Sequence, residues 1–406
     1  MVFLRFSLIV MFLFASDVPA QDAATHNSVT EHTAVNASDP LSPELLADVG
    51  IDAQRLAVID DVVGEGLRFS KMPGCVVLVG YQGHTVFHKA FGNRQLVPEQ
   101  QPMLMDTVFD MASLTKPIAT ATSVMLLVEA GQVELDASVA TYIPEFAANG
   151  KQDITVRQLL IHSGGLIPDN SMKDYADGPA KAFEKIHELG TYVEPGTKFV
   201  YTDVGFIVLA ELVERVSGKT IHKYSQKQIF QPLGMSETGY LPDENLRLRC
   251  AVTQERDGQW MRGEVHDPRA YALGGVAGHA GLFSTAGDLA KYCQMLINGG
   301  TLGDSKVMHP ETVVLMTAAA EVSSGVRTLG WDMRSPYSSN RGDFFSNAAF
   351  GHGGFTGTSM WIDPEQQLFV IFLSNRVHPD GNGSVNSLAG RIGTIAGGAI
   401  VRNAER

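Results

Sequence analysis

The chain has 406 residues, which is enough for one large domain, or for two packed domains, with a sizeable core. Its formal net charge is −13 and no run of Lys and Arg occurs, which argues against nucleic acid and anionic membrane surfaces as partners. Three cysteines exclude a disulfide scaffold; a single Cys250–Cys293 bridge stays open, and Cys75 is expected in the core.

The first twenty residues predict an export signal. Arg5 supplies a positive start, residues 8–15 form an apolar stretch that is short for a membrane span, and Val18 and Ala20 suit a cleavage site. A buried N-terminal helix is the alternative. Residues 21–42 are polar and predict a disordered leader. We therefore expect an exported protein, periplasmic or extracellular, without an integral membrane segment in the mature chain.

Two hairpins are predicted, one near each end of the chain. Residues 75–80 and 84–90 are apolar and β-branched segments joined by a turn. Residues 358–362 and 368–373 repeat this pattern around a turn that contains Pro.

The helices are predicted mainly between the hairpins. The segment 113–131 has apolar residues at helical spacing and Gly131 as its stop. Thr285 and Asp288 suggest a capping box at the start of another helix. That helix is predicted at 285–297, and two more helices are predicted at 204–216 and 384–401.

Strands at both ends with helices between them predict a mixed α/β (α+β) domain at 43–406. We expect an antiparallel sheet built from about 43–112 and 300–406, flanked by helices, with a mainly helical region at about 113–299. Clefts between two such layers are favoured sites for chemistry.

Ser113 and Lys116 are the strongest candidate catalytic residues. Three residues apart on a helix, their side chains lie on one face and can meet. A hydroxyl becomes a good nucleophile when a neighbour takes its proton, and a Lys does so when burial or other cations disfavour its charge. The alternative is a Ser that caps the helix and a solvated Lys.

Two further segments carry candidate residues. Tyr201 and Asp203 precede a helix, where Tyr201 could relay a proton to a leaving group; the alternatives are a packing residue and an N-cap. His352, Gly353 and Gly354 open the C-terminal hairpin, where glycines let a substrate approach and a strand amide could donate to an oxyanion. A turn histidine without a chemical role is the alternative for His352.

Taken in order, these motifs resemble the active-site set of the serine β-lactamase and penicillin-recognising family: Ser-x-x-Lys, then Tyr-x-Asn, then Lys-Thr-Gly or His-x-Gly. Supporting segments are similar as well, namely 156–165, 194–196, 232–235 and 281–285. The resemblance spans roughly residues 50–400 and is strongest to class C β-lactamases and their D-alanyl-D-alanine carboxypeptidase and esterase relatives. It implies a β-lactamase/transpeptidase-like fold.

The resemblance also implies roles. Ser113 would be acylated, while Lys116 and Tyr201 manage its proton and that of the leaving group. The backbone amides of Ser113 and Phe355 would form the oxyanion hole. His352 would line the substrate side of the cleft, where many relatives carry Lys.

Two departures from the family pattern bear on the substrate. Asp203 replaces the usual Asn, so a group that donates is exchanged for one that accepts when ionised. His352 and Gly353 replace Lys-Thr, which removes a permanent cation and a hydroxyl. Both changes weaken the expected grip on a substrate carboxylate, so strong β-lactamase activity is put in doubt and esters gain weight.

A segment rich in glycine, 265–281, resembles that of penicillin-binding carboxypeptidases of the cell envelope. His266, Asp267 and His279 could in principle hold a metal. The favoured interpretation is a loop cross-linked by hydrogen bonds near the cleft, without a metal, and no feature calls for a cofactor.

Three functions therefore remain. The favoured one is an exported serine hydrolase that forms an acyl-enzyme on Ser113 and acts on D-alanyl peptides, such as those derived from peptidoglycan, or on related amides. The second is an esterase for short acyl esters. The third is a penicillin-binding-like sensor or scaffold without turnover. The oligomeric state is open.

Overall fold

The structure, a computed structural model, describes residues 40–401. The predicted export signal and the predicted leader up to residue 39 lie outside this part of the chain. Leu41, at the end of that leader, donates its amide to the Thr85 carbonyl at 3.0 Å. None of the helices within residues 40–401 has the length and apolar character to cross a membrane.

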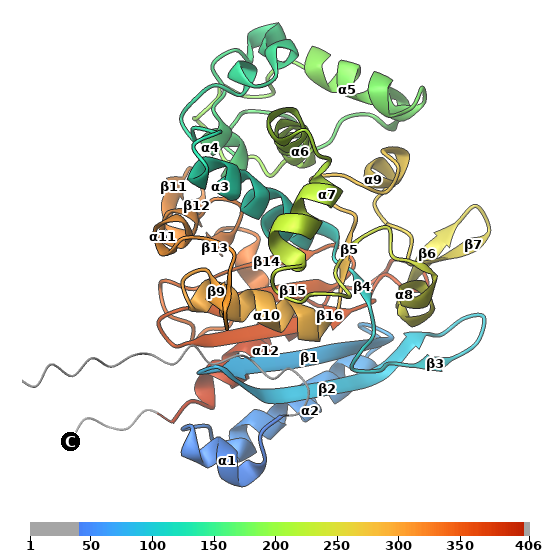
Figure 1. Ribbon diagram of the computed structural model, residues 1–406. Helices are drawn as coiled ribbons and strands as arrows, with labels where there is room; N and C mark the ends of the chain where they lie inside the picture. Colours follow the sequence, from blue (N-terminus) through green and yellow to red (C-terminus); the bar gives the residue numbers. More distant parts are fainter. Residues whose placement is uncertain (1–39, 402–406) are drawn as a thin grey trace, which may run out of the picture. The chain divides into compact units, whose positions relative to one another are not determined.

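The central element of residues 40–401 is a nine-stranded sheet in which neighbouring strands are antiparallel, in the order β11-β12-β13-β14-β15-β16-β1-β2-β3 (Figure 1). Its strands are β1 (Gly74–Tyr81), β2 (His84–Gln95), β3 (Gln101–Pro102), β11 (Ala320–Val322), β12 (Gly325–Arg327), β13 (Asp332–Arg334), β14 (Phe350–Gly354), β15 (Thr358–Asp363) and β16 (Leu368–Ser374). Because β1 pairs with both β2 and β16, with Val77 opposite Phe372, the two predicted hairpins lie side by side. The prediction of a sheet built from both chain ends is confirmed.

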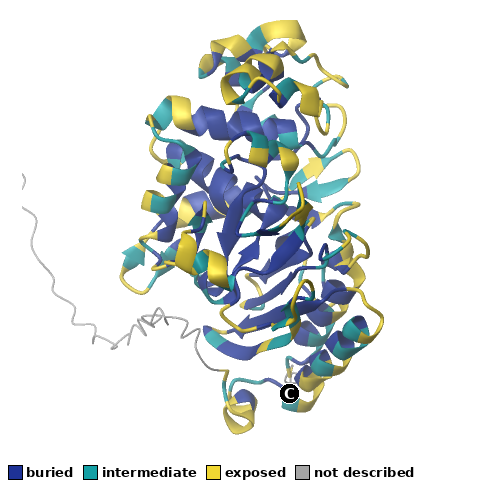
Figure 2. Ribbon diagram, turned by 90° about the vertical axis from the view of Figure 1, so that its right-hand side faces the viewer, coloured by how far each residue is buried: buried dark blue, intermediate teal, exposed yellow. Residues whose placement is uncertain are grey.

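Strand β1 is buried along its whole length because helices cover both faces of the sheet (Figure 2). Val77 and Val79 belong to a core shared with α1, α2 and α12, whereas Val76 and Leu78 belong to the core that includes α10. This alternation is the period of two expected for a strand. The helices are α1 (Pro43–Asp48), α2 (Ala53–Arg68), α10 (Ala286–Ile297) and α12 (Asn386–Gly398).

The second region is mainly helical and lies on the α10 side of the sheet (Figure 1). It contains α3 (Thr122–Glu129), α4 (Val156–Leu160), α5 (Pro179–Glu188), α6 (Asp203–Ser217), α7 (Ile221–Ser225), α8 (Glu244–Arg249) and α9 (Pro268–Ala272), and α11 (Pro310–Thr317) packs beside α3. Short strands β4 (Phe109–Asp110), β5 (Gly239–Tyr240) and β8 (Leu282–Ser284) pair with one another, as do β6 (Val252–Arg256) with β7 (Gln259–Arg262) and β9 (Thr301–Leu302) with β10 (Ser305–Lys306).

Caps fix the ends of the predicted helices. Thr202 Oγ1 accepts the Gly205 amide at 3.2 Å before α6, and Gly218 ends that helix in the left-handed region, with φ +69°. Thr285 Oγ1 accepts the Asp288 amide at 3.3 Å before α10. The reciprocal half of the predicted capping box is replaced, because the Asp288 carboxylate accepts from the Glu237 amide instead.

The predicted α-helix at 113–131 needs a correction. The segment begins with a 3₁₀ turn, η1 (Ala112–Leu114), and continues as a π-helix, η2 (Lys116–Ala121), before α3. Thr122 Oγ1 donates to the Pro117 carbonyl at 2.9 Å, and a side chain inserted into the helical ladder is a known cause of such a distortion. π-Bulges are frequent at functional sites.

The Cys250–Cys293 bridge is not formed. Cys75, Cys250 and Cys293 are all buried free thiols. Cys250 donates to the Leu246 carbonyl at 3.3 Å, whereas Cys293 lies within α10. Burial raises the pKa of Cys250 to about 12 and that of the other two thiols still further, so all three are poor nucleophiles.

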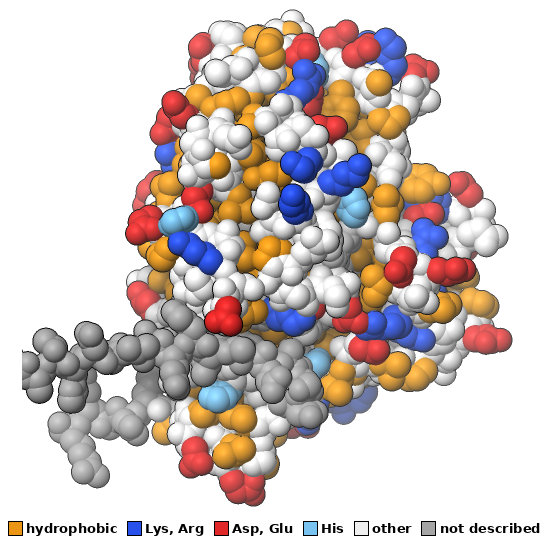
Figure 3. Space-filling view, viewed as in Figure 1, with side chains coloured by type: hydrophobic (Ala, Val, Ile, Leu, Met, Phe, Trp, Pro, Cys, Tyr) orange, Lys and Arg blue, Asp and Glu red, His pale blue; other side chains and the backbone are white. Residues whose placement is uncertain are grey.

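Acidic and basic side chains are interspersed on the face of the molecule drawn in Figure 3, with hydrophobic side chains between them. This distribution agrees with the lack of a run of Lys and Arg in the sequence.

Candidate active site

Ser113 and Lys116 meet as their spacing predicts. Ser113 lies on η1 and Lys116 on η2, and Lys116 Nζ donates to Ser113 Oγ at 3.0 Å. The Lys116 side chain is fully buried, whereas Ser113 lines a pocket of about 310 Å³. The hydroxyl is therefore accessible to a substrate and has its amine partner behind it.

The backbone before Ser113 is strained and held from several sides. Ala112 has φ +46°, which is uncommon for a residue with a side chain, and its amide is accepted by Asp110 Oδ1 at 2.8 Å. Thr356 donates to the Asp110 carbonyl at 2.8 Å, and Thr358 donates to the Met111 carbonyl at 3.1 Å. These bonds tie the Ser113 turn to the β14–β15 hairpin.

Lys116 forms an ion pair that the sequence did not predict. Its Nζ lies 2.6 Å from Asp203 Oδ1 and donates to the His279 carbonyl at 3.2 Å. Burial disfavours the charge on Lys116, but the Asp203 carboxylate, with Tyr201, outweighs burial and holds the pKa of Lys116 above its ordinary value. The charged form of Lys116 is therefore favoured in the free site, in contrast to the expectation that burial would disfavour it.

Asp203, predicted as a substrate contact, thus has a second role in the site as the ion-pair partner of Lys116. Burial opposes its ionisation, but attraction to Lys116 and His279 outweighs burial, so the pKa of Asp203 lies below its ordinary value. Asp203 also lines a second hollow, of about 500 Å³, together with Asp169 and Tyr201. It can therefore hold Lys116 and face a bound group at the same time.

Asp203, Asp267 and His279 bring their ligand atoms within 4.8 Å of one another, whereas His266 lies outside this cluster. Asp267 Oδ1 is bonded to His279 Nε2 at 2.9 Å and accepts two amides of the first turn of α9. The Lys116 ammonium contacts the same cluster through Asp203, so the acidic groups face a cation of the chain itself. Hydrogen bonds therefore cross-link this loop beside the cleft, in line with the favoured interpretation.

Tyr201, which directly precedes the N-cap of α6, lies within a stack of aromatic rings. Lys116 Nζ is 4.9 Å from its ring centroid. His162 stacks on Tyr201 with centroids 4.4 Å apart, and Tyr337 and His352 follow at 4.9 and 5.9 Å. Sequence analysis assigns no role here to His162, which lies in the supporting segment 156–165, or to Tyr337, which lies in no motif.

His352, on β14, lines the pocket but carries no charge there. Its Nδ1 lies 2.7 Å from the Gly353 carbonyl. Burial, with smaller contributions from the cations Arg327 and Lys116, keeps the pKa of His352 well below its ordinary value. Arg327 is itself fully buried 3.7 Å from Asp332, and among the described residues its guanidinium finds no hydrogen-bond acceptor. The cation in this part of the site is therefore the buried Arg327, and not His352 itself.

Gly353 and Gly354 are required by their neighbours within the protein. A Cβ at Gly353 would lie 2.5 Å from Asn340 Nδ2, and one at Gly354 would lie 2.1 Å from Thr358 Oγ1 and 2.6 Å from the Met111 carbonyl. Both glycines line the pocket. Gly354 therefore lets the hairpin approach the turn before Ser113, and Gly353 leaves room for the Asn340 side chain, in addition to the predicted approach of a substrate.

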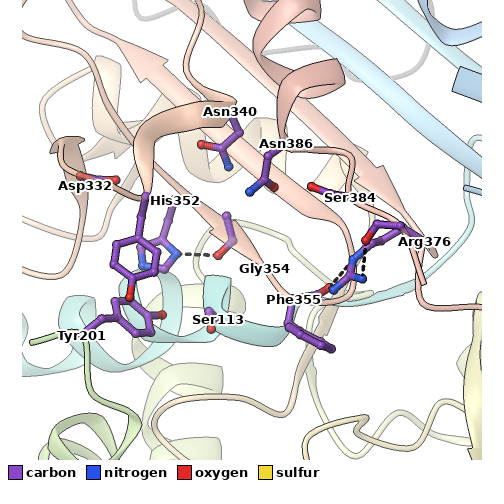
Figure 4. A pocket seen from close by; sticks show the side chains of 13 residues that line it. Ser113, Tyr201, Asp332, Asn340, His352, Gly354, Phe355, Arg376, Ser384 and Asn386 are labelled. Atoms are coloured by element: carbon purple, nitrogen blue, oxygen red, sulfur yellow. Dashed lines mark hydrogen bonds between the residues drawn. The ribbon is translucent and has the colours of Figure 1, made fainter. Parts of the chain in front are cut away.

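Phe355 follows at the turn between β14 and β15. The turn is closed by a hydrogen bond from the Gly357 amide to the Gly354 carbonyl at 3.0 Å, which does not use the Phe355 amide. The Phe355 ring is exposed and stacks on His266, with centroids 5.6 Å apart. Ser113 lies between Tyr201 and Phe355 at the mouth of the pocket (Figure 4).

Polar side chains line the rest of the pocket, and Arg376 lies beside Phe355 (Figure 4). These residues are Arg376, Ser384, Asn386 and Asn340. Sequence analysis named none of them, since Arg376 and Ser384 come from the segment between β16 and α12, Asn386 begins α12 and Asn340 ends a short 3₁₀ helix, where no motif marks a binding residue. Arg376 supplies the cation that position 352 lacks.

Known proteins are similar in sequence to this chain over most of its length. A family model described as Beta-lactamase matches residues 59–393. An Escherichia coli (strain K12) protein named "Putative D-alanyl-D-alanine carboxypeptidase" is 31% identical over 374 residues, covering 83% of this chain and 85% of its own. The N-acetylmuramyl-L-alanine amidase of Bacillus subtilis (strain 168) is 30% identical over 362 residues, covering 80% and 82%.

Solved structures share the fold at lower identity. A class C β-lactamase has a TM-score of 0.70 at 17% identity, covering 86% of this chain and 98% of its own. A penicillin-binding protein homologue from Caulobacter crescentus has a TM-score of 0.69 at 22%, covering 86% and 99%. A family VIII carboxylesterase has a TM-score of 0.67 at 23%, covering 86% and 98%. With the match to the family model over residues 59–393, these likenesses show that the chain belongs to the Beta-lactamase family.

Proposed function

We propose that this protein is an exported serine hydrolase that forms an acyl-enzyme on Ser113 and acts on D-alanyl peptides or related amide bonds. The observation that carries the proposal is the 3.0 Å contact between Lys116 Nζ and Ser113 Oγ, with a fully buried amine and a hydroxyl that faces the pocket. Family membership and the names of the relatives in Escherichia coli and Bacillus subtilis support hydrolysis of cell-wall peptides.

The geometry suggests how the proton moves. Lys116 is an ammonium held by Asp203, so it orients the Ser113 oxygen by donating to it and does not take its proton. As Ser113 Oγ bonds to the carbonyl carbon, the Tyr201 hydroxyl accepts the Ser113 proton and passes its own to the leaving nitrogen. The C–N bond breaks, the amine leaves, and a water molecule later hydrolyses the ester to free Ser113.

The negative oxygen of the tetrahedral intermediate would face the backbone amides of Ser113 and Phe355. Donors placed in advance at such an oxygen are usually the largest single contribution to this kind of catalysis. The strained turn at Ala112 and the closed turn after Gly354 support this role, because both hold backbone near Ser113.

The cation that lines the pocket favours a substrate with a free carboxylate. Arg376 is that cation, and a D-alanyl peptide ends in a carboxylate. This observation supports the peptidase over the esterase and offsets the missing cation at position 352.

An esterase is the second candidate, and the neutral state of His352 favours it. Substitution His352→Lys separates the two. If the substrate carries a carboxylate, the added cation should lower KM for the peptide by several-fold and leave KM for a neutral ester almost unchanged.

Labelling tests the proposal as a whole. A fluorophosphonate or a fluorescent penicillin should label the wild type at Ser113 and fail to label Ser113→Ala. Turnover of a D-Ala-D-Ala peptide, p-nitrophenyl butyrate and nitrocefin then ranks peptidase, esterase and β-lactamase activity. A wild type that is neither labelled nor active would favour the binding-only sensor. N-terminal sequencing of the protein recovered outside the cytoplasm tests export.

A further inference from the structure

Arg376 is bound to the residue whose amide is assigned to the oxyanion hole. It lies two residues after the end of β16, and its Nε donates to the Phe355 carbonyl at 2.8 Å, with Nη2 on the same oxygen. A guanidinium presents its N–H groups in a rigid planar fork, so two bonds to one carbonyl fix the direction of that C=O group.

The same guanidinium is anchored on its other side. Arg376 Nη1 donates to the Gly383 carbonyl at 2.9 Å and to the Gly381 carbonyl at 3.1 Å. Gly381 and Gly383 precede α12, and Gly383 lines the pocket. Arg376 therefore bridges the β14–β15 turn and the loop before α12, two segments that nothing in the sequence connects.

The Phe355 side chain completes the arrangement. Arg376 Cζ lies 4.5 Å from the centroid of the Phe355 ring, and the ring also stacks on His266. Although this ring is 61% exposed, it is held by a guanidinium and an imidazole. Contacts to both the carbonyl and the ring of Phe355 restrict rotation of its backbone, and hence the direction of its N–H group.

We infer that Arg376 is a positioning residue for the oxyanion hole: by holding the carbonyl and ring of Phe355, it aims the Phe355 amide at the reacting carbonyl oxygen. The inference rests on the proposed acyl-enzyme at Ser113. This positioning role is separate from the attraction of the Arg376 charge for a substrate carboxylate, because the four hydrogen bonds of Arg376 go to backbone carbonyls and therefore act on neutral substrates as well.

Substitution Arg376→Gln, assayed with neutral p-nitrophenyl butyrate, tests the inference. Loss of one oxyanion donor costs roughly 10²- to 10³-fold in kcat, and a displaced donor should cost less, so we expect kcat to fall roughly 10- to 100-fold with KM within about 3-fold. The affinity for phenylboronic acid, which forms a tetrahedral adduct, should fall by a similar factor. Arg376→Lys should not restore kcat, because an ammonium lacks the planar fork.

Arg391→Gln is the matched control. Arg391 loses the same charge, but its guanidinium is paired with Glu65 at 2.8 and 3.0 Å and lines a different hollow. Its kcat and boronate affinity should stay within 2-fold of the wild type.

An unchanged kcat on the neutral ester would overturn the inference, including the case in which only KM for the carboxylate peptide rises. If Arg376→Gln fails to fold, Arg376→Lys and Phe355→Ala, which keeps the amide but removes the ring, decide in the same assay. Hydrogen exchange of residues 351–357 is a readout that does not need turnover: it should be faster in the Arg376 variants and unchanged in Arg391→Gln. A wild type that fluorophosphonate does not label would refute the proposed function. Unchanged hydrogen exchange of residues 351–357 in the Arg376 variants would instead refute the positioning role of Arg376.

Discussion

Asp203→Asn tests what holds the charge on Lys116. The carboxylate lies 2.6 Å from Lys116 Nζ, with side-chain exposures of 19% and 0%. At an effective dielectric constant of about 20, two unit charges at this distance attract by roughly 6 kcal/mol before desolvation. Removing one partner of a buried pair typically costs about 3 to 5 kcal/mol, and about 1.4 kcal/mol corresponds to one pKa unit. We therefore expect the substitution to lower the pKa of Lys116, because the burial of the amine is then no longer opposed by the carboxylate.

The sign of the pH effect follows from the pKa of Lys116 in the folded wild type and in the folded variant, each compared with the ordinary value. In the wild type the pKa of Lys116 is raised, so its contribution to stability is complete below the ordinary value of about 10.4 and is lost only above it. In Asp203→Asn, burial is no longer outweighed and the pKa of Lys116 falls below the ordinary value. The unfolding free energy of the variant should then rise with pH in the window below about 10.4.

Carbon-13 NMR of labelled lysine ε-carbons measures this pKa directly, and denaturation with urea between pH 7 and 10 measures the stability effect. Asp169→Asn is the matched control, because it removes a neighbouring carboxylate whose ion pair, at 3.4 Å, is with Arg269. If Lys116 titrates at the same pH in the wild type and in Asp203→Asn, or if both variants shift it equally, the ion pair does not hold its charge.

Three further predictions follow from the site. Ser113→Ala should abolish turnover, and Lys116→Ala and Tyr201→Phe should each lower kcat by roughly 10²- to 10⁴-fold, because groups that act as a unit are not additive; residual turnover in Ser113→Ala would contradict an acyl-enzyme. Asp332→Asn should lose about 3 to 5 kcal/mol of unfolding free energy, since it leaves Arg327 buried without its partner, whereas the double variant Arg327→Met/Asp332→Asn should recover most of that loss in urea denaturation. Burial raises the pKa of Asp110 to about 6, so its ionisation costs stability as pH rises from about 4 to about 6. The unfolding free energy of Asp110→Asn, relative to that of the wild type, should therefore increase by up to about 3 kcal/mol across that window. Unfolding free energies that change with pH in parallel in the two proteins would refute this.

The parts of this protein that depend on local chain geometry were predictable. Ser113 and Lys116 meet because three residues span about one helical turn, and this holds although the turn is a 3₁₀ and π segment rather than the predicted α-helix. The hairpins at 75–90 and 358–373 follow from runs of apolar residues around a turn, which makes pairing with the nearest segment the cheapest contact to form. The family motifs supplied the candidate roles of Tyr201 and His352.

The charge state of the site depends on contacts that periodicity does not encode. Lys116 and Asp203 are far apart in the chain, and their ion pair forms because α6 packs against η2. Periodicity likewise does not indicate that Arg376 reaches the Phe355 carbonyl, or that His162 and Tyr337 stack on Tyr201.

The sequence by itself determined the contact between Ser113 and Lys116, the two hairpins and the helical region between them, because each is specified by residues close together in the chain. Only the tertiary structure decided that Lys116 is charged, that the thiols of Cys250 and Cys293 stay apart, and that a cation reaches the pocket from position 376 rather than from 352. The physical reason is that protonation and electrostatic contacts depend on burial and on distances between segments, and these are set when the helices pack on the sheet.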